Sequence, residues 1–132
     1  PEPMYKLQNS ERLKSRKEIA TLLKRGNVIS SYPLKIFWLD SPGRIYQTKA
    51  AFSVPRKKFK KAVTRNTLKR RIRESYRLNK GILMSTPATR AGCVSLFIIY
   101  TARKELSYHI IDQGMQKALD KLKKTLQNKT RS

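Results

Sequence analysis

The stretch TRNTLKRRIRESYR (residues 64–77) carries the pattern that decides how the rest of the chain is arranged. It lies in a segment, residues 56–77, that holds eleven lysines or arginines and one acid, Glu74. At 100° per residue, the basic and the apolar side chains of a helix here occupy two adjacent arcs. The basic arc comprises Asn66, Lys69, Arg70, Arg73 and Arg77, and the neighbouring arc comprises Leu68, Ile72, Ser75, Tyr76 and Asn79. We therefore predict a helix that begins between residues 62 and 66 and ends between 79 and 81, with one side buried and the other facing an anion.

Composition narrows the class of protein. The chain has 132 residues, enough for one domain with a core of its own. Lys and Arg total 31 against 8 Asp and Glu, for a net charge of +23, while 39% of the residues are hydrophobic. That apolar content predicts a folded domain and excludes a chain that is disordered throughout. The charge predicts a polyanionic partner, either nucleic acid or an anionic membrane surface.

The apolar stretches and the cysteine content indicate whether the chain crosses a membrane and in which compartment it works. The longest apolar run, residues 93–100, is far shorter than the ~18 residues of a membrane-spanning helix. The N-terminal residues lack the apolar core of a secretory signal, and one cysteine cannot form an internal disulfide. We therefore expect a cytoplasmic protein that does not cross a membrane.

Two strands and a short helix are predicted before the basic segment. In SRKEIATLLKRG (residues 15–26), Ser15 and Glu18 have capping-box spacing and Gly26 ends the helix. The run LKIFWL (residues 34–39) is rich in strand-forming residues, and a second β region follows at residues 45–54. Because turn residues separate the two β regions, we expect them to pair as a hairpin.

Three further elements follow the basic helix. A spacer of small and polar residues (81–91) predicts a surface loop, and the almost continuous apolar run CVSLFIIY (93–100) predicts a central strand covered on both faces. An amphipathic helix is predicted over residues 107–127, its apolar stripe formed by Ile111, Met115, Ala118, Leu119, Leu122 and Leu126. The chain is thus expected to be a single-domain α+β sandwich. It has a mixed sheet of about four strands with three helices, in the order α-β-β-(β)-α-β-α.

The residues offer little support for catalysis by the protein. His109 has no cluster of metal-ligating side chains near it in the sequence and is expected at the surface or in a helix cap. Cys93 lies in an apolar strand and is expected in the core. Paired carboxylates, a glycine-rich phosphate loop and a hydrolase elbow are all absent from the sequence. We therefore predict neither catalytic residues nor a metal site.

In most soluble proteins a run of like charges is only a solvated surface. Here balancing acids are nearly absent, so the basic arc is interpreted as an RNA-binding face. Arginine dominates the helix, which favours bidentate contacts with phosphate. Arg71 and Glu74 lie off the arc and are expected to be surface or local ion-pair residues.

The string KAVTRNTLKRRIRE (residues 61–74) resembles the signature helix of the bacterial ribonuclease P protein component, whose arginine-rich motif has the form AV-x-RN-xx-KR-xx-R. Other segments arrive in that family's order, and the resemblance covers roughly residues 12–126. The motif positions are Ala62, Val63, Arg65, Asn66, Lys69, Arg70 and Arg73, and the flanking segments are Arg12 and Leu13, LKIFWLD, FSVPRKK and the C-terminal amphipathic helix.

The resemblance implies a fold, an activity and partners. The fold would contain an unusual left-handed βαβ crossover. The protein would assist a catalytic ribonuclease P RNA that removes the 5′ leader of precursor tRNA, with Mg²⁺ held at the RNA active site. No protein partner is implied. Contacts with the catalytic RNA would come from Arg56, Lys57, Arg65, Asn66, Lys69, Arg70 and Arg73.

The resemblance also implies a cleft for the single-stranded leader between the first helix and the sheet. The family commonly has two Phe on that helix and a Tyr on the first strand, and the matching positions here are Ile19, Leu23 and Phe37. Base stacking on an aromatic ring is worth ~1–3 kcal/mol, so the absence of the two Phe rings weakens a cleft role for Ile19 and Leu23. Ile19, Leu23 and Phe37 are each left open between a role in the cleft and packing in the core. Lys35 lies on the same side of its strand as Phe37, where a cation beside a stacking ring suits RNA.

The domain organisation expected is one RNA-binding domain over residues 12–127, a flexible segment before it (1–11) and a short tail after it (128–132). Two other functions remain open. A structural RNA-binding protein, such as a basic ribosomal protein, shares the size and charge but does not explain the ordered motif. A protein that binds anionic membranes would need an exposed apolar face beside the cations, whereas the apolar arc here is needed to cover a sheet.

Overall fold

A computed structural model of the chain describes residues 16–42, 49–84 and 92–131. The predicted N-terminal segment 1–11 and the predicted cap Ser15 lie outside these residues. The elements are α1 (Arg16–Arg25), β1 (Asn27–Ser31), β2 (Leu34–Pro42), β3 (Lys49–Ser53), α2 (Ala62–Asn79), α3 (Gly81–Met84), β4 (Gly92–Tyr100) and α5 (Tyr108–Arg131). The basic helix has the predicted bounds, whereas α5 runs four residues further than predicted and the spacer after α2 begins with the short helix α3.

The strands form one mixed sheet in the order β1-β2-β4-β3. β2 pairs antiparallel with both β1 and β4, and β3 pairs parallel with β4. The predicted hairpin between β2 and β3 is therefore wrong, because β4 lies between them and the hairpin partner of β2 is β1. The predicted central position of β4 is confirmed. Because a strand that is apolar on both faces is most stable with a neighbour on each side, β4 takes the place between β2 and β3.

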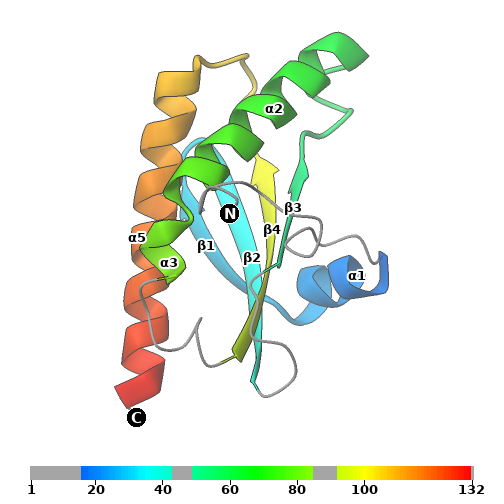
Figure 1. Ribbon diagram of the computed structural model, residues 1–132. Helices are drawn as coiled ribbons and strands as arrows, with labels where there is room; N and C mark the ends of the chain where they lie inside the picture. Colours follow the sequence, from blue (N-terminus) through cyan, green and yellow to red (C-terminus); the bar gives the residue numbers. More distant parts are fainter. Residues whose placement is uncertain (1–15, 43–48, 85–91, 132) are drawn as a thin grey trace, which may run out of the picture.

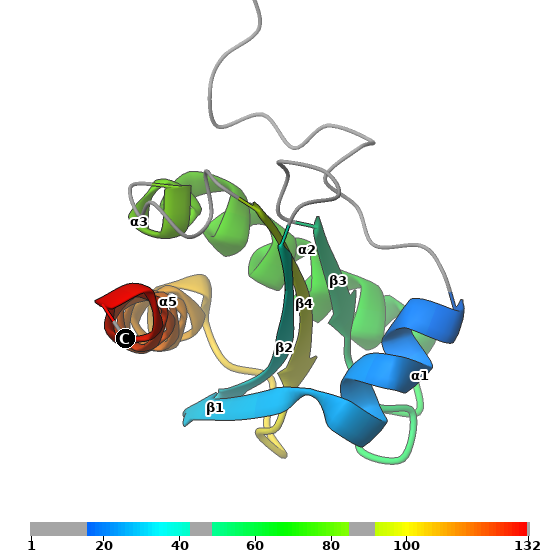
Figure 2. The ribbon, with the colours of Figure 1, turned by 90° about the horizontal axis from the view of Figure 1, so that it is seen from below.

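Helices cover both faces of this sheet. α2 and α5 lie on one face and α1 on the other (Figure 1, Figure 2). The chain passes from β3 through α2 into the parallel strand β4, which is the βαβ unit expected from the resemblance. The left-handed sense of that crossover stays a prediction.

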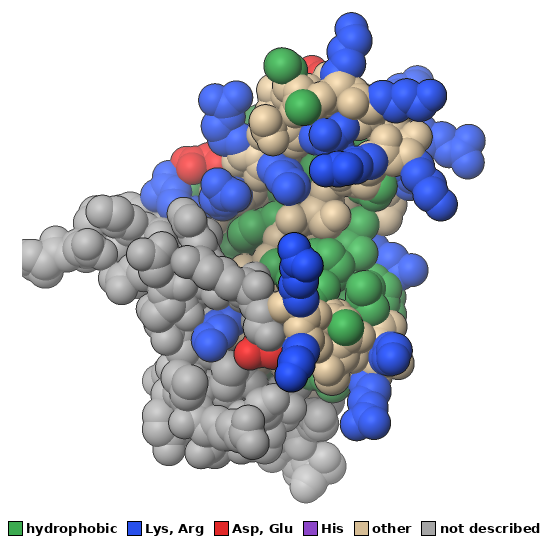
Figure 3. Space-filling view, turned by 90° about the vertical axis from the view of Figure 1, so that its right-hand side faces the viewer, with side chains coloured by type: hydrophobic (Ala, Val, Ile, Leu, Met, Phe, Trp, Pro, Cys, Tyr) green, Lys and Arg blue, Asp and Glu red, His purple; other side chains and the backbone are tan. Residues whose placement is uncertain are grey.

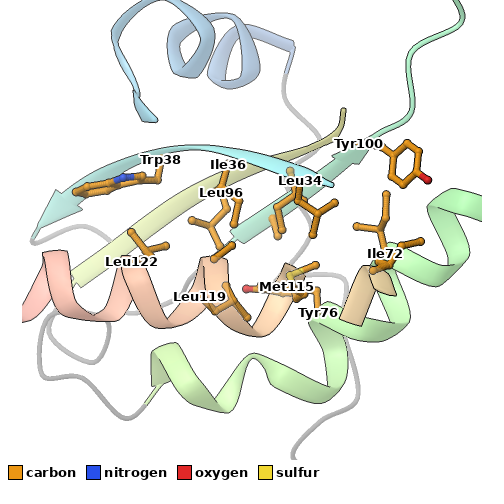
Figure 4. Packing of buried hydrophobic residues seen from close by; sticks show 14 of the residues in the cluster. Leu34, Ile36, Trp38, Ile72, Tyr76, Leu96, Tyr100, Met115, Leu119 and Leu122 are labelled. Carbon is orange, nitrogen blue, oxygen red and sulfur yellow. The ribbon is translucent and has the colours of Figure 1, made fainter. Parts of the chain in front are cut away.

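The main core lies between the sheet and the pair α2 and α5. The strand side chains Leu34, Ile36 and Trp38 alternate with the outward-facing residues of β2 and are at most 3% exposed. Figure 4 shows them facing the α5 residues Leu119 and Leu122. All six residues of the predicted α5 stripe are buried. A fully buried Leu, Ile or Met side chain contributes about 1.5–3 kcal/mol. The buried α2 residues Leu68, Ile72 and Tyr76 belong to the same core, which therefore holds α2 against the sheet.

Gly26 ends α1, as predicted. Its N–H donates to the carbonyl oxygen of Leu22 at 2.8 Å, which closes the last turn. A Cβ at this position would lie 2.3 Å from the same oxygen. Only glycine therefore allows the chain to leave α1 and enter β1 directly.

The turn between β1 and β2 packs against α5 at Gly114. A Cβ there would lie 2.7 Å from both Pro33 Cδ and the Tyr32 carbonyl oxygen. We expect Gly114→Ala to lower the free energy of unfolding by about 1–3 kcal/mol, because two backbone elements would have to separate. Urea unfolding measures this change.

Gly81→Ala is the matched control for this substitution. A Cβ at Gly81 would meet nothing within 4 Å, and Ala favours helix over Gly. Its stability should therefore be equal to or above that of the parent. Equal unfolding midpoints for Gly114→Ala and the parent would show that the turn does not press on α5.

Candidate nucleic-acid interface

In the structure, the two arcs predicted for α2 differ in their exposure to solvent. The apolar arc is closed off from solvent, since Leu68, Ile72, Ser75 and Tyr76 are all 0% exposed. On the other side Asn66, Arg70 and Arg73 are exposed, and Arg65 and Lys69 are half-buried. The first turn of α2 contains no acidic residue. An anion approaching this side therefore meets several cations on one rigid element.

Arg65 differs from the other cations of the motif because part of its guanidinium is used inside the protein. Its Nη1 donates to the carbonyl oxygens of Phe59 at 2.8 Å and of Lys60 at 2.9 Å. Both acceptors belong to the basic loop that enters α2. Arg65 thus fixes this loop while keeping its charge at the surface.

Lys58 fastens the same loop on its other side. Its Nζ donates to the carbonyl oxygen of Thr101 at 2.8 Å, at the end of β4. Phe59, between these two anchors, is 8% exposed and lies in the main core with its ring 5.7 Å from that of Tyr100. Arg56 and Lys57 are exposed. They precede the fastened part of the loop, residues 58–60, and project from a loop that is held to the protein just after them.

Two arginines of α2 are engaged with acids. Arg71 lies 3.7 Å from Glu105 and also donates to the carbonyl oxygen of Leu106. Arg77 forms two hydrogen bonds with Glu74, and the bond to Arg77 lowers the pKa of that carboxyl. Glu74 forms the local ion pair that was predicted, whereas the partner of Arg71 is distant in the sequence. Arg77 has the phase of the basic arc, but it is half-buried and its charge is balanced by Glu74 one turn away.

The space-filling view shows how the charges gather. In Figure 3, Lys and Arg crowd the upper part of the molecule, over the N-terminal half of α2 and the loop before it. A band of hydrophobic side chains lies below them, and α1 with further cations lies below that band. The face therefore joins a basic region to an apolar one.

A second, small core lies between α1 and the sheet, and we call its residues the apolar band. Leu22 and Ala51 are buried there, and the partly buried residues around them are Ile19, Phe37, Leu39 and Phe97. Leu23 is 48% exposed. Of the two helix positions left open by the sequence, Ile19 thus packs in this cluster, whereas Leu23 offers an apolar surface to solvent.

Strand pairing brings Phe37 and Phe97 together, which sequence reasoning missed. They are directly opposed across β2 and β4, in a row that continues to Val28 on β1 and Ala51 on β3. Lys35 Nζ lies 5.2 Å from the centre of the Phe37 ring, so the predicted shared side is confirmed. A strand pairing of 37 with 97 could not be read from the sequence once β3 was expected beside β2.

The residues considered for protein chemistry do not gather into a site. The His109 ring nitrogen lies 3.2 Å from Gln113 Nε2 on the exposed side of α5, and the Cys93 side chain lies outside the described residues. Within residues 16–42, 49–84 and 92–131, no group of three or more His, Cys, Asp or Glu is placed to hold a metal ion. In the same ranges, every helix is too short or too polar to cross a membrane.

Comparison with known proteins gives the family. A sequence model described as Ribonuclease P matches residues 7–123. The chain belongs to the ribonuclease P protein family. It is 34% identical over 118 residues to the ribonuclease P protein component of Porphyromonas gingivalis strain W83, an alignment that covers 89% of this chain and 86% of the relative.

Solved structures of ribonuclease P proteins share the fold. The Staphylococcus aureus RNase P protein aligns with a TM-score of 0.70 at 20% identity, over 86% of this chain and 95% of that one. The Thermotoga maritima protein aligns with a TM-score of 0.67 at 23% identity, over 84% and 96%. The α+β fold with a four-stranded mixed sheet is thus that of ribonuclease P proteins.

Family membership also gives the biochemical setting. Ribonuclease P is an endoribonuclease holoenzyme in which catalysis is attributed to the RNA, and members of this family are its protein component. RNA binding and tRNA processing are therefore the functions that go with this family.

Proposed function

We propose that this chain binds the catalytic RNA of ribonuclease P through α2 and the loop before it. The residues proposed are Arg56, Lys57, Arg65, Asn66, Lys69, Arg70 and Arg73. The observation that carries the proposal is the structure of this face: the loop is fastened by Arg65 and Lys58, and exposed cations flank it on an 18-residue helix. Neutralising phosphates here releases counterions and relieves the repulsion among like charges one helical turn apart.

We also propose that the 5′ leader of precursor tRNA lies against the apolar band between α1 and the sheet. Phe37 and Phe97 would stack with unpaired bases, Lys35 would meet a phosphate, and Leu23 with Ile19 would border the path. Both phenylalanines are only partly buried, which supports access to their rings. Stacking is tolerant of base identity, so the site suits leaders of many sequences.

The protein's role would then be to hold substrate and RNA together. We propose that Mg²⁺ is bound by phosphate oxygens of the RNA, which are hard ligands of the kind that Mg²⁺ prefers. Precursor tRNA and the catalytic RNA would be the partners, in the cytoplasm. The cations of α2 would lower the Mg²⁺ concentration that the RNA needs, because they share in neutralising its phosphates.

Reconstitution tests this function. The chain is added to a bacterial ribonuclease P RNA at low Mg²⁺, and cleavage of precursor tRNA is followed with the RNA alone as the reference. Stimulated formation of the mature 5′ end is expected. A basic ribosomal protein of similar size serves as control for charge. Equal stimulation by both proteins, or none by this chain, would reject the proposal in favour of a general RNA-binding role.

Arg65 allows a test of the loop anchor that keeps the net charge. Lysine cannot reproduce the guanidinium contact with two carbonyl oxygens, so Arg65→Lys should free the loop. Amide hydrogen exchange in residues 56–61 should become about five- to tenfold faster. Arg70→Lys, at an exposed position of the same helix, should leave the exchange of this loop unchanged. Unchanged exchange in Arg65→Lys would mean that Lys58 and Phe59 suffice to hold it.

A further inference from the structure

The carboxylate of Asp112, near the start of α5, bridges to the C-terminal part of α2. Asp112 Oδ1 accepts hydrogen bonds from Ser75 Oγ at 2.8 Å and from Asn79 Nδ2 at 2.7 Å, both on α2. On α5 itself, Gln116 Nε2 donates to Asp112 Oδ2 at 2.8 Å, and the Tyr108 hydroxyl lies 3.5 Å from Oδ1. Asp112 therefore joins two residues of α2 to two of α5.

The arrangement is directional on both helices. Ser75 and Asn79 are one turn apart on α2, and Asn79 Nδ2 also donates to the Ser75 carbonyl oxygen at 2.8 Å. Tyr108 and Gln116 lie one turn before and one turn after Asp112 on α5. Bonds to a charged acceptor are stronger and more oriented than neutral ones, so this set fixes both the rotation of α2 and its position along α5.

The side chains around position 112 favour a hydrogen-bond acceptor there over an apolar side chain. Ser75 is 0% exposed, so its hydroxyl would lose a partner in a buried position if Asp112 were removed. Burial and the nearby Asp112 and Glu74 carboxylates raise the pKa of the Tyr108 hydroxyl, which keeps its proton available for donation. The neighbouring α2 and α5 side chains Ile72 and Met115 are buried and apolar and impose no such direction.

We propose that Asp112 is a positioning residue for RNA binding: it orients α2 so that Lys69, Arg70 and Arg73 meet the RNA together. Arg73 is only two residues from Ser75, the first α2 residue that Asp112 holds. The inference rests on the RNA-binding role proposed for α2. Acids are scarce in this chain, which has a net charge of +23. Asp112 belongs to α5 and contacts α2 from that side, away from the proposed RNA surface.

The negative charge of Asp112 and its positioning of α2 predict opposite changes in RNA affinity when the residue is removed, which makes the inference testable. Removing an acid from a protein that binds a polyanion should strengthen binding if only long-range charge matters. Removing the residue that orients α2 should weaken binding. Asp120 is the matched control because it lies on the same helix and its carboxylate is 52% exposed, with an ion pair to Lys124 at 3.2 Å.

The experiment compares the parent chain with Asp112→Ala, Asp112→Asn and Asp120→Ala. Affinity for ribonuclease P RNA is measured over a range of salt concentrations, well below each unfolding temperature, with circular dichroism to verify folding. We expect Asp112→Ala to bind about three- to tenfold more weakly with a smaller salt slope. Asp120→Ala should bind as tightly as the parent or tighter. Asp112→Asn should recover most of the affinity, because its amide oxygen can still accept from Ser75 and Asn79.

Each outcome decides between the possibilities. Folded Asp112→Ala that binds as tightly as Asp120→Ala, with the parent's salt slope, would overturn the inference. If Asp112→Ala does not fold, the double variant Ser75→Ala with Asn79→Ala replaces it; this variant removes the α2 donors and leaves Asp112 to Gln116 and Tyr108. Unchanged affinity in that variant also overturns the inference. Failure of the parent chain to bind the RNA would instead reject the proposed function itself.

Discussion

Replacing Lys69, Arg70 and Arg73 together by alanine is expected to weaken binding of ribonuclease P RNA by roughly 100-fold and to lower its salt dependence by about two to three contacts. The three side chains share the open side of α2, whose opposite side is buried. Their removal would take away the proposed phosphate contacts without touching the core, so the fold should persist. Affinity measured at several salt concentrations gives both quantities.

The matched control removes the same charge from another surface. Lys117, Lys121 and Lys124 are exposed on α5, and replacing all three by alanine gives the same net charge as the α2 variant. We expect this control to lose far less affinity, through long-range attraction alone. Equal losses in the two triple variants would mean that total charge, and no particular face, determines binding.

The second large effect is expected in the choice between precursor and mature tRNA. Phe37→Leu with Phe97→Leu keeps apolar side chains in the small core under α1 but removes both aromatic faces. Because stacking on a ring contributes ~1–3 kcal/mol per base, the preference for precursor should fall by about 10- to 100-fold. Dissociation constants of the reconstituted holoenzyme for the two tRNAs measure this ratio.

Phe52→Leu is the control for this pair. Phe52 lies on the other face of the sheet, where its ring meets Tyr76 with centroids 5.6 Å apart. This change should alter stability without altering the preference for precursor. The double Phe37 and Phe97 variant is compared with the parent for its preference for precursor over mature tRNA. An equal preference would show that the leader does not bind the sheet, and α1 would be the remaining candidate for the leader site.

The pattern of α2 could be predicted because it is local. Periodicity places Leu68 and Ile72 on the buried side whatever the rest of the chain does, and the same holds for the α5 stripe. Strand pairing is not local. The short and polar β1 (NVISS) gave little signal, so β2 was assigned to β3, the next strand that the sequence did indicate.

The exposure of the candidate site residues could be predicted where it depends on helical phase, and not where it depends on tertiary contacts. The exposed cations Arg70 and Arg73 follow from helical phase, as does the separation of Arg71 from them. The inward bonds of Arg65 depend on the path of the preceding loop, and the pair of Phe97 with Phe37 depends on strand order. Charge pattern alone cannot distinguish a cation that holds a loop from one that binds a ligand.

The place of β4 in the sheet has a consequence for synthesis of the chain on the ribosome. β4 is the last strand to be made, yet it lies between β2 and β3. Until it emerges, β3 has no partner and the apolar side of α2 has no complete sheet to cover. The α2 segment is therefore synthesised before the sheet that it covers is complete, and it gains its full packing surface only when β4 is added. Correct assembly with RNA should therefore require that β4 and the residues after it are synthesised before the RNA binds.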